Sequence, residues 1–362
     1  MMTSPLIASG NSAAPVVPPV APGRLPGIGH LPFLVQDPMG FMRSLLPIGG
    51  VVRIYLGSRP MYIVNTLDLV FDVLVTDVEN YKRGVIFEKA ERVLGQGLTT
   101  SEGEIHLKHR KMIQPILQKQ QVERYSTTMI DVAQGIVDSW TQSDAIDVNQ
   151  RMHALGMDMF CRALFRNQLA ADAASRVKQA TPSFMAGIVA QSLYPAEWLE
   201  KLPLPVNRRF NVARSQMESA VAEIVRVYRS GDGQQDDGLA ILDMLMSMRD
   251  EHSGQGMSDS QLRDEIINLV VAGAEAPGTT LAWLFYELSQ RPDIEAELRK
   301  EIATELGDRP LTVASLKGLS FAKAIVKETL RLHTPTWLLT RRATEAAQLG
   351  GYRIPAGAEV AF

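Results

Sequence analysis

The sequence predicts a mainly α-helical protein with a small β part at both ends of the chain. From about residue 67 to residue 339, apolar residues recur at helical spacing between clusters of Pro, Gly and Asp. Two short alternating runs, residues 51–57 and 61–66, lie on either side of a short break and predict a β-hairpin. The segment 349–362 is rich in turn residues and predicts a second hairpin that stops within a strand.

Length and composition exclude several classes of protein. The chain has 362 residues, of which 46% are hydrophobic, and this is enough to bury a large core. A net charge of −3 leaves no basic excess for nucleic acid. The single cysteine, Cys161, excludes an internal disulfide framework and favours a reducing, cytoplasmic location. No apolar run reaches the roughly 18 residues of a transmembrane helix.

Residues 1–23 differ in composition from the rest of the chain. They are rich in Ala, Pro and Val, which predicts a disordered or polyproline-like lead-in. They contain neither Lys nor Arg, so they make a poor signal peptide. Contact of this apolar tail with a membrane surface is the alternative. Residues 24–362 are predicted to form one domain.

The segment 259–290 predicts one long helix with an apolar middle. Pro277 cannot donate a hydrogen bond to the carbonyl of Gly273, which predicts a kink beside a groove lined by glycine. Glu275 lies at the same point, where a carboxylate is costly unless it is paired or functional. Either this is a kinked structural helix with a satisfied carboxylate, or it is a small-molecule site in which Glu275 moves protons.

Two further helices carry charged residues at helical spacing. Glu328 and Arg331 are three residues apart among apolar neighbours, which predicts a partly buried ion pair. His106 and Arg110 are four residues apart on one helix face, which suits a carboxylate partner. The alternative for this second helix is a solvated basic face that includes His109. A metal pair of His106 and His109 is disfavoured because no third ligand is near in the sequence.

These motifs resemble those of one family when they are taken together and in order. HLKHR resembles the HxxxR element of cytochromes P450, AGAEA resembles the AGxET element, and ETLRL resembles the ExxR element. TRRATEAAQLGGYRIPAGAEV is similar to the segment that follows the third element in the family. The resemblance covers about residues 24–362 and implies a cytochrome P450 fold, incomplete at the C-terminus. The stretches LPLPVNRRFN, WLLTRRA and GGYRIPAGA are most similar to actinobacterial members that oxidise terpenes.

The resemblance implies a haem-thiolate monooxygenase that contains haem b with its iron. The implied reaction inserts one oxygen atom from O₂ into a lipophilic substrate, for which a terpenoid is the candidate, with electrons from a ferredoxin and a ferredoxin reductase. The resemblance assigns the cofactor contacts to His106, Arg110, Arg341 and Gly273. It assigns proton delivery to Glu275 and makes Glu328 and Arg331 a structural ion pair. The substrate pocket that it implies is lined by Val85, Ile86, Phe87, Thr336, Trp337 and Leu338.

The sequence departs from the family pattern at two points. Ala276 occupies the position of the family's alcohol residue, so a water, Thr279, Thr280 or a substrate hydroxyl would have to replace it. The segment with the axial cysteine is expected beyond Phe362, so no iron ligand is predicted within this chain, and the fragment alone is expected to be inactive. Cys161 lies in an apolar helical pattern and is predicted to be a core residue.

Three alternatives remain open from the sequence. Ala276 also permits a P450-fold enzyme that uses peroxide. A missing thiolate favours a non-catalytic helical protein derived from the family. A terpene cyclase would need a metal-binding acidic motif, for which Asp236 and Asp237, in a predicted loop, are the nearest candidates.

Overall fold

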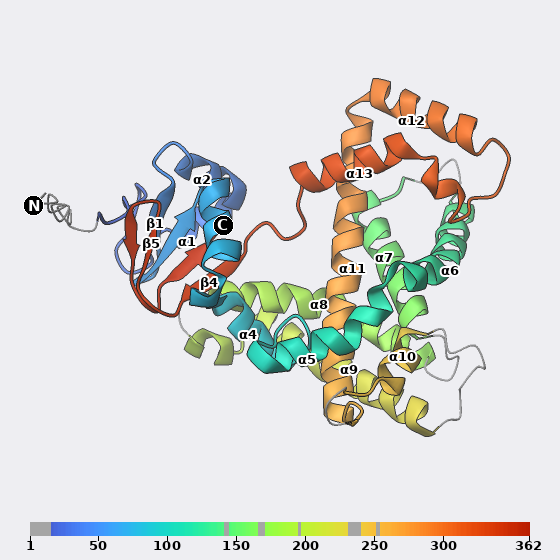
Figure 1. Cartoon of the computed structure of the whole chain (residues 1–362), viewed down its shortest axis with the longest axis horizontal. Helices are drawn as coiled ribbons and strands as arrows, with labels where there is room; N and C mark the ends of the chain where they lie inside the picture. Colours follow the sequence, from blue (N-terminus) through green and yellow to red (C-terminus); the bar gives the residue numbers. More distant parts are fainter. Residues whose placement is uncertain (1–15, 141–144, 166–170, 195–196, 231–239, 251–253) are drawn as a thin grey trace, which may run out of the picture. The chain divides into compact units, whose positions relative to one another are not determined.

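The protein is described here by a computed structural model. It covers residues 16–140, 145–165, 171–194, 197–230, 240–250 and 254–362. The chain divides into two compact units (Figure 1). The first joins the two ends of the chain, Met1–Ile86 and Leu338–Phe362, and the second comprises Phe87–Trp337. Asp236 and Asp237, the residues considered for a cyclase motif, lie outside the described residues.

The first unit is built on a five-stranded sheet with the order β1-β2-β7-β4-β3. The predicted N-terminal hairpin is confirmed, since β1 and β2 pair antiparallel with Val51 opposite Val64. The second strand begins at Arg59, so the turn is tighter than the sequence indicated, and Gly57 takes a φ of 62° within it. The strands are β1 (Val51–Leu56), β2 (Arg59–Val64), β3 (Tyr81–Arg83), β4 (Thr340–Ala343) and β7 (Glu359–Ala361).

The predicted C-terminal hairpin of 349–362 is wrong in its pairing. The hairpin is formed by β5 (Ala347–Leu349) and β6 (Tyr352–Ile354), which turn at two glycines with positive φ. β7 leaves this hairpin and lies in the large sheet between β2, to which it is parallel, and β4, to which it is antiparallel. Its backbone groups therefore pair with a strand on each side, and it is not a bare edge.

Both faces of the large sheet are covered. Alternate residues of β1 and β2 belong to two separate hydrophobic clusters, with Val51 and Val64 in one and Val52 and Ile63 in the other. Packing starts ahead of residue 24, because Ala21 is buried beside β1. The short helices of this unit are α1 (Leu31–Gln36), α2 (Pro38–Leu45), α3 (Leu67–Phe71), the π-helical turn η1 (Asp72–Thr76) and η2 (Val78–Asn80).

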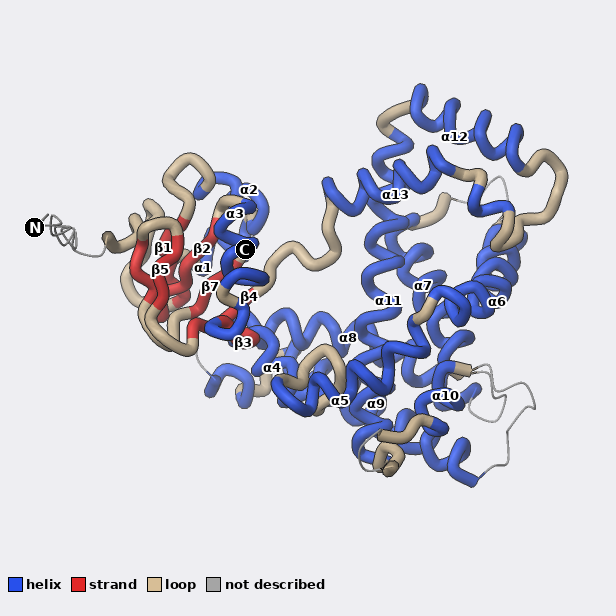
Figure 2. Tube along the Cα trace, viewed as in Figure 1, coloured by secondary structure: helices blue, strands red, loops and turns tan. Residues whose placement is uncertain are grey.

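In the second unit, every regular element among the described residues is a helix (Figure 2). The pair α8 and α9 forms a large part of its core, where the rings of Phe184 and Phe210 stack at 5.6 Å. Its helices are α4 (Val85–Leu94, which starts in the first unit), α5 (Gly103–Ile113), η3 (Gln114–Leu117), α6 (Lys119–Asp138), α7 (Val148–Leu164), α8 (Ala171–Leu193), η5 (Glu197–Lys201), α9 (Pro205–Ser230), α10 (Ile241–Ser247), α11 (Asp259–Ser289), α12 (Pro292–Glu305), η6 (Ser315–Lys317) and α13 (Ser320–Leu332).

The predicted long helix is α11, which runs the length of the helical unit (Figure 1). Ser258 starts it with a capping box, in which its side chain and that of Gln261 bond to each other's backbone. The first half of α11 contributes to the main core, whereas its second half is buried on one side, at Leu284 and Leu288, and exposes Trp283 and Tyr286. The apolar middle of α11 is therefore exposed on one side, at Ala272, Glu275 and Pro277. Among the described residues, no helix combines the length and the apolar character that a membrane crossing requires.

Candidate active site

The centre of α11 brings together Glu275 and two glycines that contact α7. A side chain at Gly273 would meet the Phe160 ring at 2.2 Å, and one at Gly278 would meet the backbone of His153 at 2.7 Å. These glycines therefore allow α7 and α11 to lie close together. Glu275 keeps 49% of its side chain exposed and lies 3.8 Å from the Nδ1 atom of His153. The apolar sequence around Glu275 does not bury it, because its neighbours Ala272 and Pro277 are also exposed.

α11 continues through Pro277, which lies inside the helix as the sequence predicts. The Thr280 hydroxyl is buried and donates a hydrogen bond of 2.8 Å to the carbonyl oxygen of Ala276. Its proton is therefore already used within the helix. The other side-chain hydroxyl considered as a replacement, that of Thr279, is half-buried and has no hydrogen-bond partner among the described residues.

α5 presents His106 and Arg110 at its surface. The Nδ1 atom of His106 lies 3.0 Å from the Leu98 carbonyl oxygen, which fixes the ring. Arg110 is exposed and, within the described part of the chain, has no ion-pair or hydrogen-bond partner. A fixed imidazole beside an available guanidinium suits a carboxylate-bearing ligand.

His109 does not share the solvated face that the sequence suggested. It is buried, and its Nδ1 atom lies 2.6 Å from an oxygen of Glu265 in α11, which is buried as well. The two atoms form no hydrogen bond, so the contact is an ion pair when the ring is protonated. His109 thus packs inward, and it forms no metal pair with His106.

Polar contacts also join the segment before α5 to α11. The other oxygen of Glu265 accepts a hydrogen bond of 3.0 Å from the Leu98 amide, whose carbonyl fixes His106. Asn268 donates to the Leu94 carbonyl oxygen at 3.0 Å, and its side chain would collide with any Cβ at Gly97. α11 therefore sets the position of the segment that holds His106.

Glu328 and Arg331 form a bidentate pair on α13, with distances of 2.6 and 2.8 Å. The expectation that the pair is partly buried is wrong, because 55% of the Glu328 side chain and 66% of the Arg331 side chain are exposed. α13 buries the side of the helix that carries Thr329, and the charged pair lies away from it. The hydrogen bond from Arg331 lowers the pKa of Glu328.

The predicted pocket residues are divided between the two units. Val85, Ile86 and Phe87 start α4 and are half-buried, whereas Thr336 and Trp337 are exposed in the segment after α13. Val85 and Ile86 belong to the first unit, with Leu338, while the other three belong to the second. Arg341 lies in β4, where its guanidinium donates to the Thr340 carbonyl oxygen at 3.1 Å. The pocket and the role of Arg341 stay predictions.

Cys161 is a core residue, as the sequence predicts. It is 2% exposed in α7, and its sulfur lies 3.6 Å from that of Met157. Burial raises the pKa of its thiol to about 12, which disfavours the thiolate form that binds metals. Cys161 is therefore unsuited to be a haem ligand, and an axial cysteine beyond Phe362 stays a prediction.

The donor set on α5 fits haem b, whose two propionates are carboxylates. Arg110 supplies an exposed fork of donors, and His106 is held in place beside it. The other helix that the resemblance assigns to the cofactor, α11, exposes Ala272 and Glu275 at its centre.

Two of the contacts that shape this site had no signal in the sequence. His153 and Glu265 are distant in the chain from the residues they meet, and only helix packing brings them there.

The fold and these motifs define the class of haem-binding monooxygenases. The chain belongs to the cytochrome P450 family, whose model matches residues 18–362. The match starts close to the first residues that pack in the structure, and it spans both units.

Among characterised relatives, the chain is 34% identical to cyclooctatin synthase from Streptomyces melanosporofaciens, over 94% of this chain and 74% of that protein. It is 32% identical to pentalenene oxygenase from Streptomyces avermitilis, over 94% and 75% of the two chains. Cyclooctat-9-en-7-ol 5-monooxygenase from Streptomyces melanosporofaciens is 31% identical, over 99% and 78%. These relatives agree with the predicted similarity to terpene-oxidising members.

The fold is shared with a solved structure of retinoic acid-bound CYP120A1 from a cyanobacterium. The TM-score is 0.80 at 20% sequence identity, over 96% of this chain and 77% of the other. The mainly α fold with a small β part is thereby confirmed. The protein is a cytochrome P450 monooxygenase with haem b as its cofactor.

Proposed function

We propose that the protein inserts one oxygen atom from O₂ into a cyclic terpenoid. The observation that carries this proposal is the similarity, over nearly the whole chain, to relatives that are named for pentalenene and cyclooctat-9-en-7-ol. Haem supplies the activation of dioxygen when it is bound. Electrons come from a ferredoxin and its reductase in this proposal, and the buried thiol of Cys161 suits a reducing, cytoplasmic location.

The chain's own residues have three roles in this proposal. Arg110 and His106 hold the propionates. Glu275, half exposed on α11, collects protons from solvent, with His153 at 3.8 Å as the nearest titratable side chain on α7. Glu328 and Arg331 are the structural ion pair of this proposal, a bidentate bond on the exposed side of α13.

The direct test uses ¹⁸O₂. The full-length protein that contains this chain is loaded with haem and incubated with a ferredoxin, its reductase and either pentalenene or cyclooctat-9-en-7-ol, and the products are analysed by mass spectrometry. We expect a product with one labelled oxygen atom. Products that carry oxygen from water only, or no product from either compound or from a wider set of cyclic terpenes, would contradict the proposal.

The cofactor contact is tested separately by replacing Arg110. We expect Arg110→Gln to retain less haem than the wild-type protein, because one carboxylate loses its charged partner. Lys119→Gln is the control, since Lys119 is also exposed and basic but starts α6. Equal haem content and equal haem affinity in both variants would remove Arg110 from the site.

A second candidate function is oxygen transfer from hydrogen peroxide, which Ala276 favours. No side-chain hydroxyl is present at that position, and the Thr280 hydroxyl is bonded to the Ala276 carbonyl. The two candidates are separated by an assay with peroxide and without reductase. Higher turnover with peroxide than with the ferredoxin system would favour this second candidate.

A further inference from the structure

The segment 94–101 leads from α4 toward α5 and is fastened to the first half of α11. Asp264 accepts a hydrogen bond of 3.1 Å from the Gln96 amide, and Asn268 donates one of 3.0 Å to the Leu94 carbonyl oxygen. The Asn268 side chain is buried, so its bonds to the backbone of this segment replace bonds to water. α11 therefore holds the segment in one conformation, although the segment itself is neither helix nor strand.

Glu265 binds the same segment from within the core. One of its carboxylate oxygens accepts a hydrogen bond of 3.0 Å from the Leu98 amide. The other oxygen lies 2.6 Å from the Nδ1 atom of His109, and both of these side chains are buried. A carboxylate that is removed from water needs such partners, because nothing else replaces its hydration. The two contacts fix the carboxylate, and the carboxylate in turn fixes the backbone at Leu98.

The backbone of Leu98 extends this contact to His106. The Leu98 carbonyl oxygen lies 3.0 Å from the Nδ1 atom of the imidazole. A carbonyl oxygen only accepts hydrogen bonds, so Nδ1 is the donor, and Nε2 is the ring nitrogen that can meet a carboxylate ligand. The direction of Nε2 therefore depends on where the Leu98 carbonyl lies, and this position depends on Glu265.

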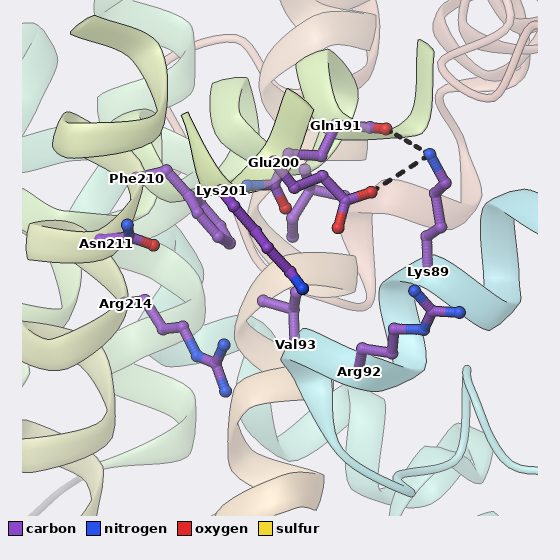
Figure 3. Close-up of a pocket in the computed structure, with 10 residues that line it drawn as sticks. Lys89, Arg92, Val93, Gln191, Glu200, Lys201, Phe210, Asn211 and Arg214 are labelled. Carbon is purple, nitrogen blue, oxygen red and sulfur yellow. Dashed lines mark hydrogen bonds and ion pairs between the residues drawn. The ribbon is translucent and has the colours of Figure 1, made fainter. Parts of the chain in front are cut away.

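α4, which precedes the segment, has a separate anchor at Lys89 (Figure 3). The Nζ atom of Lys89 donates to the Gln191 carbonyl oxygen at 2.7 Å and to that of Tyr194 at 3.3 Å. It also lies 3.3 Å from an oxygen of Glu200, and only 10% of the Lys89 side chain is exposed. These contacts tie α4 to the end of α8 and to η5, and not to α11. Lys89 is therefore a buried anchor of similar kind that does not act through Leu98.

We propose that Glu265 is a positioning residue for the haem, which acts through Leu98 on His106 and does not touch the cofactor itself. This inference rests on the proposed function, in which His106 holds a propionate. Two successive hydrogen bonds of 3.0 Å lead from the Glu265 carboxylate to the imidazole. The same helix carries Glu275, so the connection fixes the cofactor contact relative to the carboxylate that delivers protons in that function.

The test measures how fast ferric haem leaves the full-length protein that contains this chain, by transfer to an excess of apomyoglobin. Glu265→Gln keeps an acceptor for the Leu98 amide, whereas His109→Leu/Glu265→Leu removes it without leaving a buried imidazole unpaired. We expect the double variant to release haem about threefold to tenfold faster than Glu265→Gln, because the hydrogen bond that places Leu98 is lost. His106→Ala should also release haem faster than the wild-type protein.

Two controls separate positioning from general loosening of the fold. When His106→Ala is already present, His109→Leu/Glu265→Leu should not accelerate haem release further, since the two changes act on one contact. Lys89→Met, which removes the anchor of α4, should release haem at the wild-type rate.

The inference would be overturned by equal release from Glu265→Gln and the double variant, by the same acceleration in the His106→Ala background, or by the same acceleration in Lys89→Met. Each of these outcomes leaves the proposed contact of His106 with a propionate intact. Release from His106→Ala at the wild-type rate would instead contradict that contact, and with it the role of Glu265.

Discussion

At the scale of single residues, burial decides how much an ion pair contributes to the free energy of unfolding. Glu265 and Glu328 each have a basic partner at 2.6 Å. The Glu265 side chain is fully buried, whereas more than half of the Glu328 side chain is exposed to solvent. Water and salt screen the exposed pair, while the buried carboxylate has only His109 and the Leu98 amide to replace its lost hydration.

This contrast predicts different effects for the same substitution. Glu265→Ala should lower the free energy of unfolding by about 3–5 kcal/mol, because a buried partner is left uncompensated. Glu328→Ala should stay close to the wild-type value, because its pair is solvated. Denaturant unfolding of both variants under the same conditions measures the difference. A similar loss in the two variants would show that burial does not govern the contribution of these pairs.

A second residue-scale feature is the alanine that follows Glu275. Ala276 has no hydroxyl to pass on a proton, and the nearest buried hydroxyl, that of Thr280, donates to the backbone. In the role proposed for Glu275, proton delivery lacks a side-chain relay at the next position of α11. This makes the coupling of electron use to product formation sensitive to residue 276.

Ala276→Thr should raise the fraction of consumed reductant that appears as product and should lower the release of hydrogen peroxide, because it restores a hydroxyl beside Glu275. Both quantities are measured in one steady-state assay. Ala296→Thr makes the same change on the exposed surface of α12 and should alter neither. If both ratios stay the same in Ala276→Thr, proton delivery does not depend on this position.

At the scale of elements, the contact between α7 and α11 depends on a residue without a side chain. At Gly273, the ring of Phe160 occupies the space that a Cβ would take. The ring belongs to a side chain packed against the main core, so it cannot move away without disturbing other contacts. Glycine is costly inside a helix, and here its cost is offset by the close approach of the two helices.

Gly273→Ala should therefore destabilise the protein by about 1–3 kcal/mol, although alanine is the better helix former. Phe160→Leu in the same chain should recover part of the loss, because it removes the ring from that space. Thermal unfolding of the two single variants and the double variant forms a cycle that measures the coupling. Additive effects would mean that the two residues do not compete for space.

At the scale of the whole molecule, the chain crosses between the two units twice, at residues 86–87 and 337–338. Each unit has hydrophobic clusters of its own, made of the sheet in the first and of helices in the second. The family match nevertheless extends over both units, so they belong to one functional protein.

Because each unit has a core of its own, we expect a destabilising substitution in one unit to increase amide hydrogen exchange mainly in that unit. Ile63→Ala, in β2, should increase amide hydrogen exchange in β1, β2 and β7 far more than in α8 and α9, because it leaves a cavity in the core of the sheet. Phe184→Ala should give the opposite pattern. Exchange measured by mass spectrometry on both variants checks this. Equal increases in both units after either change would indicate a single cooperative core.

Much of the fold follows from local patterns in the sequence. The N-terminal hairpin, the long helix α11, the core position of Cys161 and the motifs of the cytochrome P450 family all depend on residues close together in the chain. Alternation, helical periodicity and short motifs are local properties, and for this reason they can be recognised without a structure.

Other features were decided only by tertiary structure. β7 joins the sheet of β2 and β4 because its partners lie far away in the chain. His109 faces inward to Glu265, and the Glu328 pair faces outward, although both helices have mixed polar and apolar sequences. The sequence determines which side chains are available on each element, whereas the packing of distant elements decides their neighbours and burial, and so their charge environment.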